Sequence, residues 1–155
     1  MTTDSTRDLK RPIAFAGLVV GVLDGLDAMI LTWWFGGSPW RMFQGIAGGL
    51  LGREAARAGG VPTVLLGILC HFTIATCVSA VYIVASRKLP LLVAHPILCG
   101  ALYGVGVWAS MRWVVISLSA LGGPGPLTAT SLVNGLVAHT LFVGIPAALI
   151  ARAAR

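Results

Sequence analysis

Charged side chains are scarce in this chain. Asp, Glu, Lys and Arg make up only 10% of its 155 residues, whereas 57% are hydrophobic and the mean hydropathy is +0.90. Soluble domains use about 25% charged residues. The chain therefore has too little polar surface to cover a soluble globule, and its composition predicts an integral membrane protein.

Motifs for the common enzymatic chemistries are also missing. The sequence has no G-x-S-x-G, P-loop, H-E-x-x-H or Rossmann fingerprint. Its cysteines, Cys70, Cys77 and Cys99, form no C-x-x-C pair, so we expect small apolar side chains rather than disulfides or a zinc site. No basic cluster with interleaved aromatic residues accompanies the net charge of +6. We expect neither an enzyme nor a nucleic-acid partner.

Long apolar runs, in contrast, are abundant. Four segments exceed the roughly 20 residues needed to cross a ~30 Å hydrocarbon core. The first is not a secretory signal, because two aspartates interrupt it. The sequence predicts an all-α fold, an integral membrane bundle of four transmembrane helices, with one domain over residues 13–151 after a cytoplasmic tail of residues 1–12. The expected spans are residues 13–35, 62–85, 91–117 and 127–150.

Basic residues are distributed unevenly around these spans. If both termini are cytoplasmic, the short connection with Arg87 and Lys88 is cytoplasmic too, and most of the basic residues lie on that side. The positive-inside rule then predicts a multi-pass protein of the bacterial inner membrane with both termini in the cytoplasm. The cytoplasmic set is Arg7, Lys10, Arg11, Arg87, Lys88, Arg152 and Arg155, against Arg41, Arg53 and Arg57 outside.

The external connection after the first span is typical of an amphipathic helix, over residues 38–58. Ser38 can cap it, Pro39 suits its first position, and glycines follow its end. Its apolar residues fall near one face, as in a helix lying in the membrane interface. Overlapping G-x-x-x-G pairs would alternatively let the segment dip into the bundle. The apolar face comprises Trp40, Phe43, Ala47, Leu50 and Leu51.

Five polar residues, Asp24, Asp27, His71, Arg112 and His139, interrupt the apolar runs. A central Asp costs about 2.5–3.5 kcal/mol on insertion, whereas each Leu, Ile, Phe or Val returns about 0.3–0.6. The first span is therefore marginal alone and needs partners in the bundle. At ~1.5 Å per residue, the aspartates and histidines fall near the midplane, with Arg112 further out. His95, directly before Pro96, is expected to be a boundary residue of the third span.

Small residues at four-residue steps accompany this cluster. Such stripes are where transmembrane helices pack closely, so the polar side chains are expected to face protein rather than lipid. The stripes are Gly17, Gly21 and Gly25; Gly67, His71, Ala75 and Ser79; Gly100, Gly104, Trp108 and Arg112; and Ser131, Gly135 and His139.

Three functions are compatible with the polar cluster. The leading one is a non-enzymatic accessory or structural subunit, alone or in a larger membrane complex, with Asp27 coupled to Arg112. The second is a proton- or ion-translocating protein in which the aspartates and histidines form a relay. Four helices are few for alternating access, so this function favours a homo-oligomer. The third is a redox protein with His71 and His139 as haem or metal ligands.

Three glycine-rich stretches, "QGIAGGLLGREAARAGG", "CGALYGVGVW" and "VGIPAALIAR", support the same architecture. With the spacing between them, they resemble an uncharacterised family of small bacterial four-helix inner-membrane proteins. The resemblance implies the four-helix fold and transfers no activity, because its motifs are packing patterns.

Overall fold

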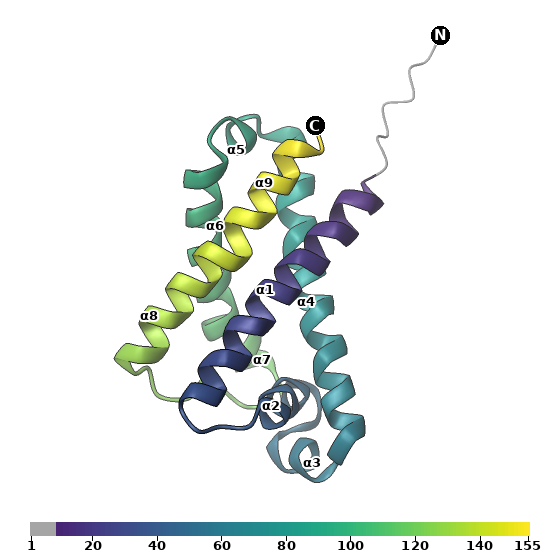
Figure 1. Cartoon of the computed structure of the whole chain (residues 1–155), viewed down its shortest axis with the longest axis vertical. Helices are drawn as coiled ribbons and strands as arrows, with labels where there is room; N and C mark the ends of the chain where they lie inside the picture. The colour runs from purple at the N-terminus through teal and green to yellow at the C-terminus, as the bar shows by residue number, and fades with distance from the viewer. Residues whose placement is uncertain (1–8) are drawn as a thin grey trace.

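The structure, a computed structural model, describes residues 9–155, and this part of the chain consists of helices and their connections, without strands (Figure 1). The predicted tail at residues 1–12 lies largely outside it. The elements are α1 (Lys10–Trp34), α2 (Pro39–Leu51), α3 (Arg53–Ala58), α4 (Gly60–Lys88), α5 (Leu91–Ala94), α6 (Pro96–Ser110), the π-helical turn η1 (Met111–Val115), α7 (Ile116–Leu118), α8 (Ala129–Ala138), the π-helical turn η2 (His139–Gly144) and α9 (Ile145–Ala153).

Four long helices are apolar enough to cross a membrane, as the sequence predicts. They are α1, α4, the continuous helix α6–η1–α7 (Pro96–Leu118), and the continuous helix α8–η2–α9 (Ala129–Ala153). Large apolar side chains stay exposed along their outer faces, for example Leu18 and Ile30 on α1. In water such a surface would be unstable, so it suits a hydrocarbon environment.

Proline and glycine set the helix boundaries. Pro12 and Pro62 each lie in a first helical turn, where a missing N–H costs no hydrogen bond, so α1 and α4 begin slightly earlier than expected. His95 leaves the helical conformation directly before Pro96, with φ −123° and ψ 63°, and separates α5 from α6. The predicted boundary at His95 is confirmed, although the third span begins at Pro96 rather than at residue 91.

The expected helix over residues 38–58 is instead two helices. Gly52 has φ +80° and ψ 163°, a conformation that L side chains rarely adopt, and it separates α2 from α3. α2 packs on the start of α4, where Gln44 Nε2 donates to Thr63 Oγ1 at 3.3 Å and Gly67 meets the backbone of Phe43. Of the predicted apolar face, Ala47 is buried, whereas Trp40, Leu50 and Leu51 are exposed.

Glycine faces bring the long helices together. On α1, a Cβ at Gly17 would overlap Thr76, and a Cβ at Gly21 would lie 2.6 Å from the ring of Phe72 on α4. On α6, a Cβ at Gly104 would overlap the backbone carbonyl oxygen of His139. The predicted small-residue stripes on these helices therefore lie in helix–helix contacts, as expected.

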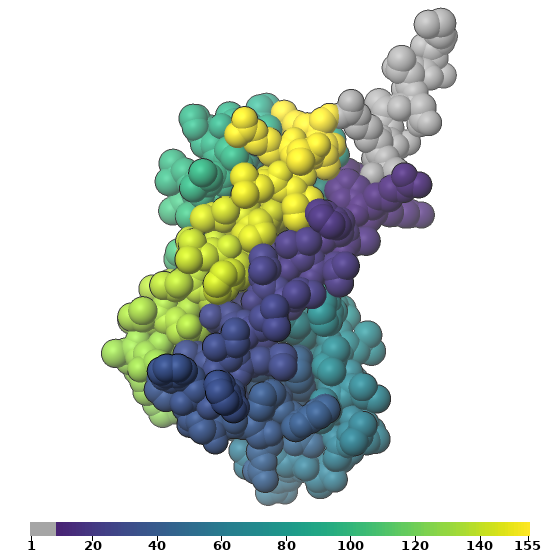
Figure 2. All heavy atoms as spheres, in the orientation of Figure 1, coloured from purple at the N-terminus to yellow at the C-terminus, as the bar shows by residue number. Residues whose placement is uncertain are grey.

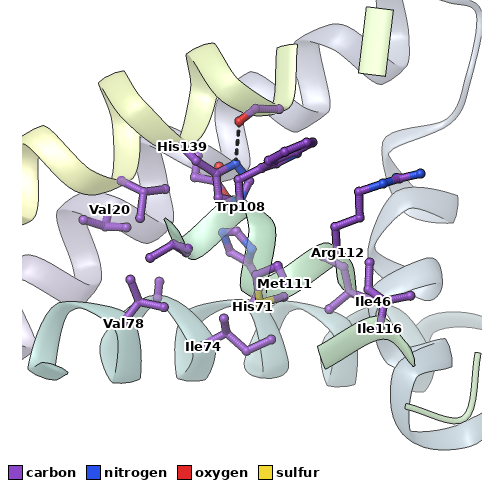
Figure 3. A pocket seen from close by; sticks show the side chains of 15 residues that line it. Val20, Ile46, His71, Ile74, Val78, Trp108, Met111, Arg112, Ile116 and His139 are labelled. Carbon is purple, nitrogen blue, oxygen red and sulfur yellow. Dashed lines mark hydrogen bonds between the residues drawn. The ribbon is translucent and has the colours of Figure 1, made fainter. Parts of the chain in front are cut away.

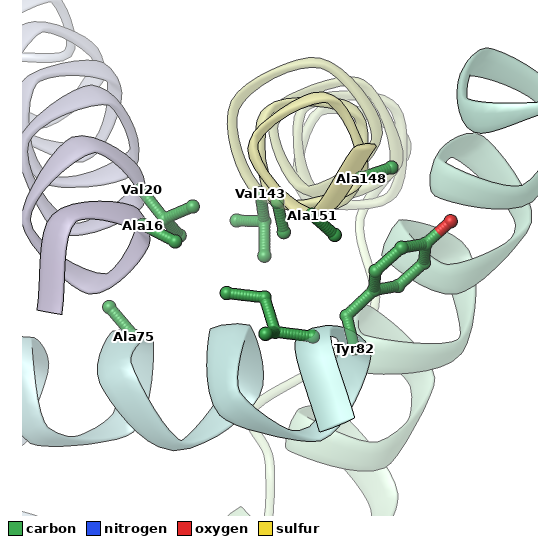
Figure 4. Close-up of a cluster of buried hydrophobic side chains, with 9 residues drawn as sticks. Ala16, Val20, Ala75, Tyr82, Val143, Ala148 and Ala151 are labelled. Carbon is green, nitrogen blue, oxygen red and sulfur yellow. The ribbon is translucent and has the colours of Figure 1, made fainter. Parts of the chain in front are cut away.

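The bundle has its densest packing toward the end that holds the C-terminus. Figure 1 shows the described start of α1, α5 and the C-terminus at this end, with α2 and α3 at the other. Arg87 Nη2 donates to the Ala154 carbonyl at 3.0 Å, which ties α4 to the end of α9. Figure 4 shows the core there, formed by Ala16, Val20, Ala75, Tyr82, Ile83, Val143, Ala147, Ala148 and Ala151.

The four long helices do not close into a symmetric ring. α1 packs against α4 and also lies along η2–α9, as the surface in Figure 2 shows, while α6 packs against η2–α9 from the other side. In the described chain, the backbones of α4 and α6 lie further apart than those of the other neighbouring long helices, and two tyrosines bridge them: Tyr103 donates its hydroxyl to the Val78 carbonyl at 2.7 Å and its ring meets Tyr82 edge-on.

Candidate functional site

A cavity with a mostly apolar wall and four ionisable side chains lies between the four long helices; we call it the polar cavity after those four groups. It has a volume of about 320 Å³, and Asp24 from α1, His71 from α4, Arg112 from η1 and His139 from η2 line it (Figure 3). These are four of the five polar residues singled out from the sequence. The other lining residues are Val20, Ile46, Ile74, Ala75, Val78, Val107, Trp108, Met111, Ile116, Gly135 and Val143.

The fifth residue, Asp27, lies outside this cavity lining and has a different partner. Asn134 on α8 donates from Nδ2 to Asp27 Oδ2 at 3.1 Å. An amide donor is the group that a carboxylate in an apolar surrounding needs. Asp27 therefore acts as a polar link between α1 and α8. Sequence reasoning missed Asn134, because the search for partners considered charged residues and histidines.

Arg112 and Asp27 do not form an ion pair in the described structure, so the predicted direct partnership is wrong. Arg112 Nη2 donates to the Gly125 carbonyl at 2.7 Å, in the loop that connects the third and fourth spans. Figure 3 shows the side chain extending away from the histidines. The loop carbonyl of Gly125 thus accepts a hydrogen bond from the guanidinium in place of the Asp27 carboxylate. The Nε of Arg112 is buried and has no hydrogen-bond partner.

His71 is held in one orientation by α1. Its Nε2 lies 2.8 Å from the Gly21 carbonyl oxygen, and since a carbonyl only accepts, Nε2 carries the proton and donates. A Cβ at Gly25 would lie 3.1 Å from the same nitrogen, so glycine at this position leaves room for the ring. Phe72 meets the ring edge-on with centroids 5.5 Å apart. Nδ1 has no partner among the described residues.

His139 is held in the same manner from the other side of the cavity. Its Nδ1 lies 3.0 Å from the Gly135 carbonyl oxygen and donates to it, so Nε2 is left without a partner among the described residues. The Trp108 indole covers Gly135, where any Cβ would overlap it. The neutral forms of both histidines therefore each keep one unused acceptor nitrogen.

Both π-helical turns of the described chain carry a cavity residue, Arg112 in η1 and His139 in η2. π turns are rare and often occur at functional sites. For η2 the cause is local, since Pro146 has no N–H to donate to the carbonyl four residues earlier, which interrupts the α-helical pattern. Pro146 inside an expected span was the available sequence signal, and it was not used.

Asp24 is the unsatisfied member of the group. It lines the cavity, and no described residue bonds to its carboxylate or pairs with it. Asp24 is half-buried, so its carboxylate oxygens remain free to accept hydrogen bonds from water or a ligand within the cavity. The two aspartates thus differ in their partners, although they are three positions apart on one helix: Asp27 accepts a hydrogen bond from Asn134, and Asp24 has no described partner.

The described residues contain no group of three or more His, Cys, Asp or Glu side chains that could hold a metal ion. Cys70, Cys77 and Cys99 are free thiols, and none of them lines the polar cavity. The ionisable side chains that line the cavity, one carboxylate, two imidazoles and a guanidinium, can exchange protons and form hydrogen bonds.

Fold and site together define an all-helical protein with four helices suited to crossing a membrane and a polar cavity between them. Comparison of the chain with protein-family models, curated proteins and solved structures gives no match.

Proposed function

We propose that the chain is an inner-membrane protein of bacteria that crosses the bilayer four times with both termini in the cytoplasm. The excess of basic residues at the end that holds the C-terminus and the Arg87–Lys88 turn supports this orientation. α2 and α3 then lie on the outer side. The exposed side chains Trp40, Leu50 and Leu51 would meet the membrane interface there.

Reporter fusions test this topology. A reporter that works only in the cytoplasm should be active when fused at residue 155 and inactive when inserted near Gly60. A reporter that works only on the external side should show the opposite pattern. An external C-terminus would refute the four-span arrangement.

The function that we propose is proton uptake and translocation through the polar cavity. One observation carries it: Asp24 presents a carboxylate without a described partner to a cavity that it shares with two histidines. Ionisable residues inside a membrane are costly, and they commonly mark proton or ion pathways. Imidazoles with an unused nitrogen can accept a proton from the carboxylate and return it.

The Asp27–Asn134 link supports a structural role for Asp27 only. A purely structural cluster, as in an accessory subunit, would leave no reason for Asp24 to lack a partner. The two aspartates therefore provide an internal comparison, since they share a helix, a charge and a similar depth.

The test is proton flux in liposomes that contain only phospholipid and the purified protein. A potassium gradient with valinomycin drives the flux, and a trapped pH-sensitive dye reports it. We expect flux with the native chain, at least tenfold less with Asp24→Asn, and nearly native flux with Asp27→Asn.

Flux indistinguishable from empty liposomes would refute translocation and leave the accessory or structural role. Equal losses of proton flux in Asp24→Asn and Asp27→Asn would show that the flux does not depend on a carboxylate lining the cavity. The visible absorption spectrum of the same preparation tests the haem alternative, because a Soret band that disappears in His71→Ala or His139→Ala would replace the proton proposal.

A further inference from the structure

The gap between α4 and α6 forms a long apolar groove on the side of the bundle. Toward the end that holds the C-terminus it has a volume of about 730 Å³, and the Tyr82 and Tyr103 rings lie in its wall. Toward α2 a second section of about 680 Å³ continues between α4 and η1–α7. Val115 lines both sections. We call the two sections together the α4–α6 groove.

The α4–α6 groove adjoins the polar cavity. Val78, Val107 and Met111 line both the cavity and the groove section with the tyrosines. Ile46 and Ile74 line both the cavity and the section next to α2. These shared side chains stand between the two hollows, so in the proposed topology the groove gives a molecule dissolved in the bilayer a sideways approach to the cavity that crosses no headgroup layer.

The groups left unsatisfied in the cavity indicate the chemistry of an occupant. Asp24 and the free nitrogens of His71 and His139 are acceptors, whereas the Arg112 Nε–H is a buried donor without a partner. Acceptors predominate, so a hydroxyl-bearing head is complementary, because each hydroxyl donates one hydrogen bond and can also accept one.

The arrangement of these groups favours a head with two hydroxyls. Asp24 and His71 lie at the α1–α4 contact, where His71 bonds to Gly21, while His139 reaches the cavity from η2. A single hydroxyl would satisfy one side only. The Trp108 indole forms part of the cavity wall beside His139 and provides an aromatic surface for a flat ring (Figure 3).

We propose that the cavity binds the ring of a membrane-soluble hydroquinone, with its hydroxyls on Asp24 or His71 and on His139, and that its apolar tail lies in the α4–α6 groove. A cavity of about 320 Å³ is of the size that holds a small ring, at the lower end of ligand pockets. This inference rests on the proposed function in that it assigns a ligand to the same polar cavity.

Binding is measured with a decyl-tailed hydroquinone, kept reduced by ascorbate under argon, and the full-length protein in phospholipid nanodiscs. Decylbenzene, which lacks the hydroxyls, and dodecanol, which has one hydroxyl and no ring, are the comparison ligands. We expect saturable binding of the hydroquinone, and binding at least tenfold weaker for each comparison ligand.

Two matched pairs of variants locate the ligand. Asp24→Asn should weaken binding about tenfold or more, and Asp27→Asn should not. Gly106 lines the groove, and a Cβ there meets no atom within 4 Å, so Gly106→Leu should obstruct the tail without displacing the backbone. A Cβ at Gly45 on α2 is equally unobstructed, and Gly45 does not line the groove, so Gly45→Leu is the control.

Absence of saturable binding, or equal binding of decylbenzene, would overturn the proposal. Equal binding of dodecanol would refute the ring, and native affinity in Gly106→Leu would refute the groove as the site of the tail. Proton flux in quinone-free liposomes separates the two proposals. Flux without hydroquinone binding would overturn this inference alone, and binding without flux would refute translocation and leave the ligand site.

Discussion

The link between Asp27 and Asn134 allows a quantitative test of how α1 and α8 are joined. Asn134 is the described donor to the Asp27 carboxylate, at 3.1 Å, and removing the amide leaves that carboxylate without it. Hydrogen bonds between transmembrane helices average about 0.6 kcal/mol and reach about 1.7 kcal/mol in double-mutant cycles. A charged acceptor strengthens such a bond. We therefore expect a coupling free energy of about 1–1.7 kcal/mol.

The measurement is a double-mutant cycle with Asp27→Ala, Asn134→Ala and the double variant. The free energy of unfolding of each is obtained by titrating the protein from a mild detergent into sodium dodecyl sulfate and following far-UV circular dichroism. Asn134→Ala should destabilise the native chain by about 1–3 kcal/mol, because it leaves the half-buried carboxylate of Asp27 without its described donor. The same substitution should cost less when Asp27 is already alanine.

A parallel cycle with Asp27→Ala and Arg112→Ala is the control. Because Arg112 bonds to the loop carbonyl of Gly125 rather than to Asp27, these two losses should add to within about 0.3–0.5 kcal/mol. The reasoning is refuted if the Asn134 cycle is additive while the Arg112 cycle shows coupling above about 1 kcal/mol, since that would restore the ion pair expected from the sequence.

Three further substitutions, the first with a matched control, test the packing and the backbone. Gly104→Ala should lower the free energy of unfolding by about 1–3 kcal/mol because its methyl would overlap η2. Gly106→Ala, where the added methyl meets open space, should be neutral or stabilising. Thermal unfolding should therefore give the lower melting temperature for Gly104→Ala, and equal melting temperatures would contradict the contact. Gly52→Ala should cost about 1–3 kcal/mol because of its positive φ, and a native melting temperature would argue against the break there. Tyr103→Phe should cost about 0.5–1.5 kcal/mol through the lost bond to the Val78 carbonyl, measured by detergent unfolding, and no loss would mean that water replaces the hydroxyl.

The long helices were predictable because length and hydrophobicity determine them almost alone. A run of some 20 apolar residues has few alternatives to a spanning helix, and boundaries such as His95–Pro96 follow from local backbone sterics. The break at Gly52 was harder to predict, since nothing in the sequence alone distinguishes it from the other glycines of the segment before its positive φ is known.

The geometry of the site was predictable only in part. Depth along each helix and small-residue stripes indicated which side chains face the interior, and four of them line one cavity. Their partners depend on the rotation of one helix against another. The bonds from Asn134 to Asp27 and from Arg112 to a loop carbonyl therefore could not be obtained from spacing within a single helix.

The π turn at His139–Gly144 also constrains how this helix tolerates changes in length. A π turn accommodates about one extra residue within an α-helix, and each residue of an α-helix corresponds to a rotation of about 100°. Because the wider turn absorbs that residue, deleting one residue within it would let the helix revert to regular α geometry while α8 and α9 keep their relative orientation, so Asn134 would stay at Asp27. A deletion in the regular helix between Asn134 and His139 would instead rotate Asn134 by about 100° away from Asp27. The π turn is thus a place where this helix can lose a residue and keep its contacts on both sides.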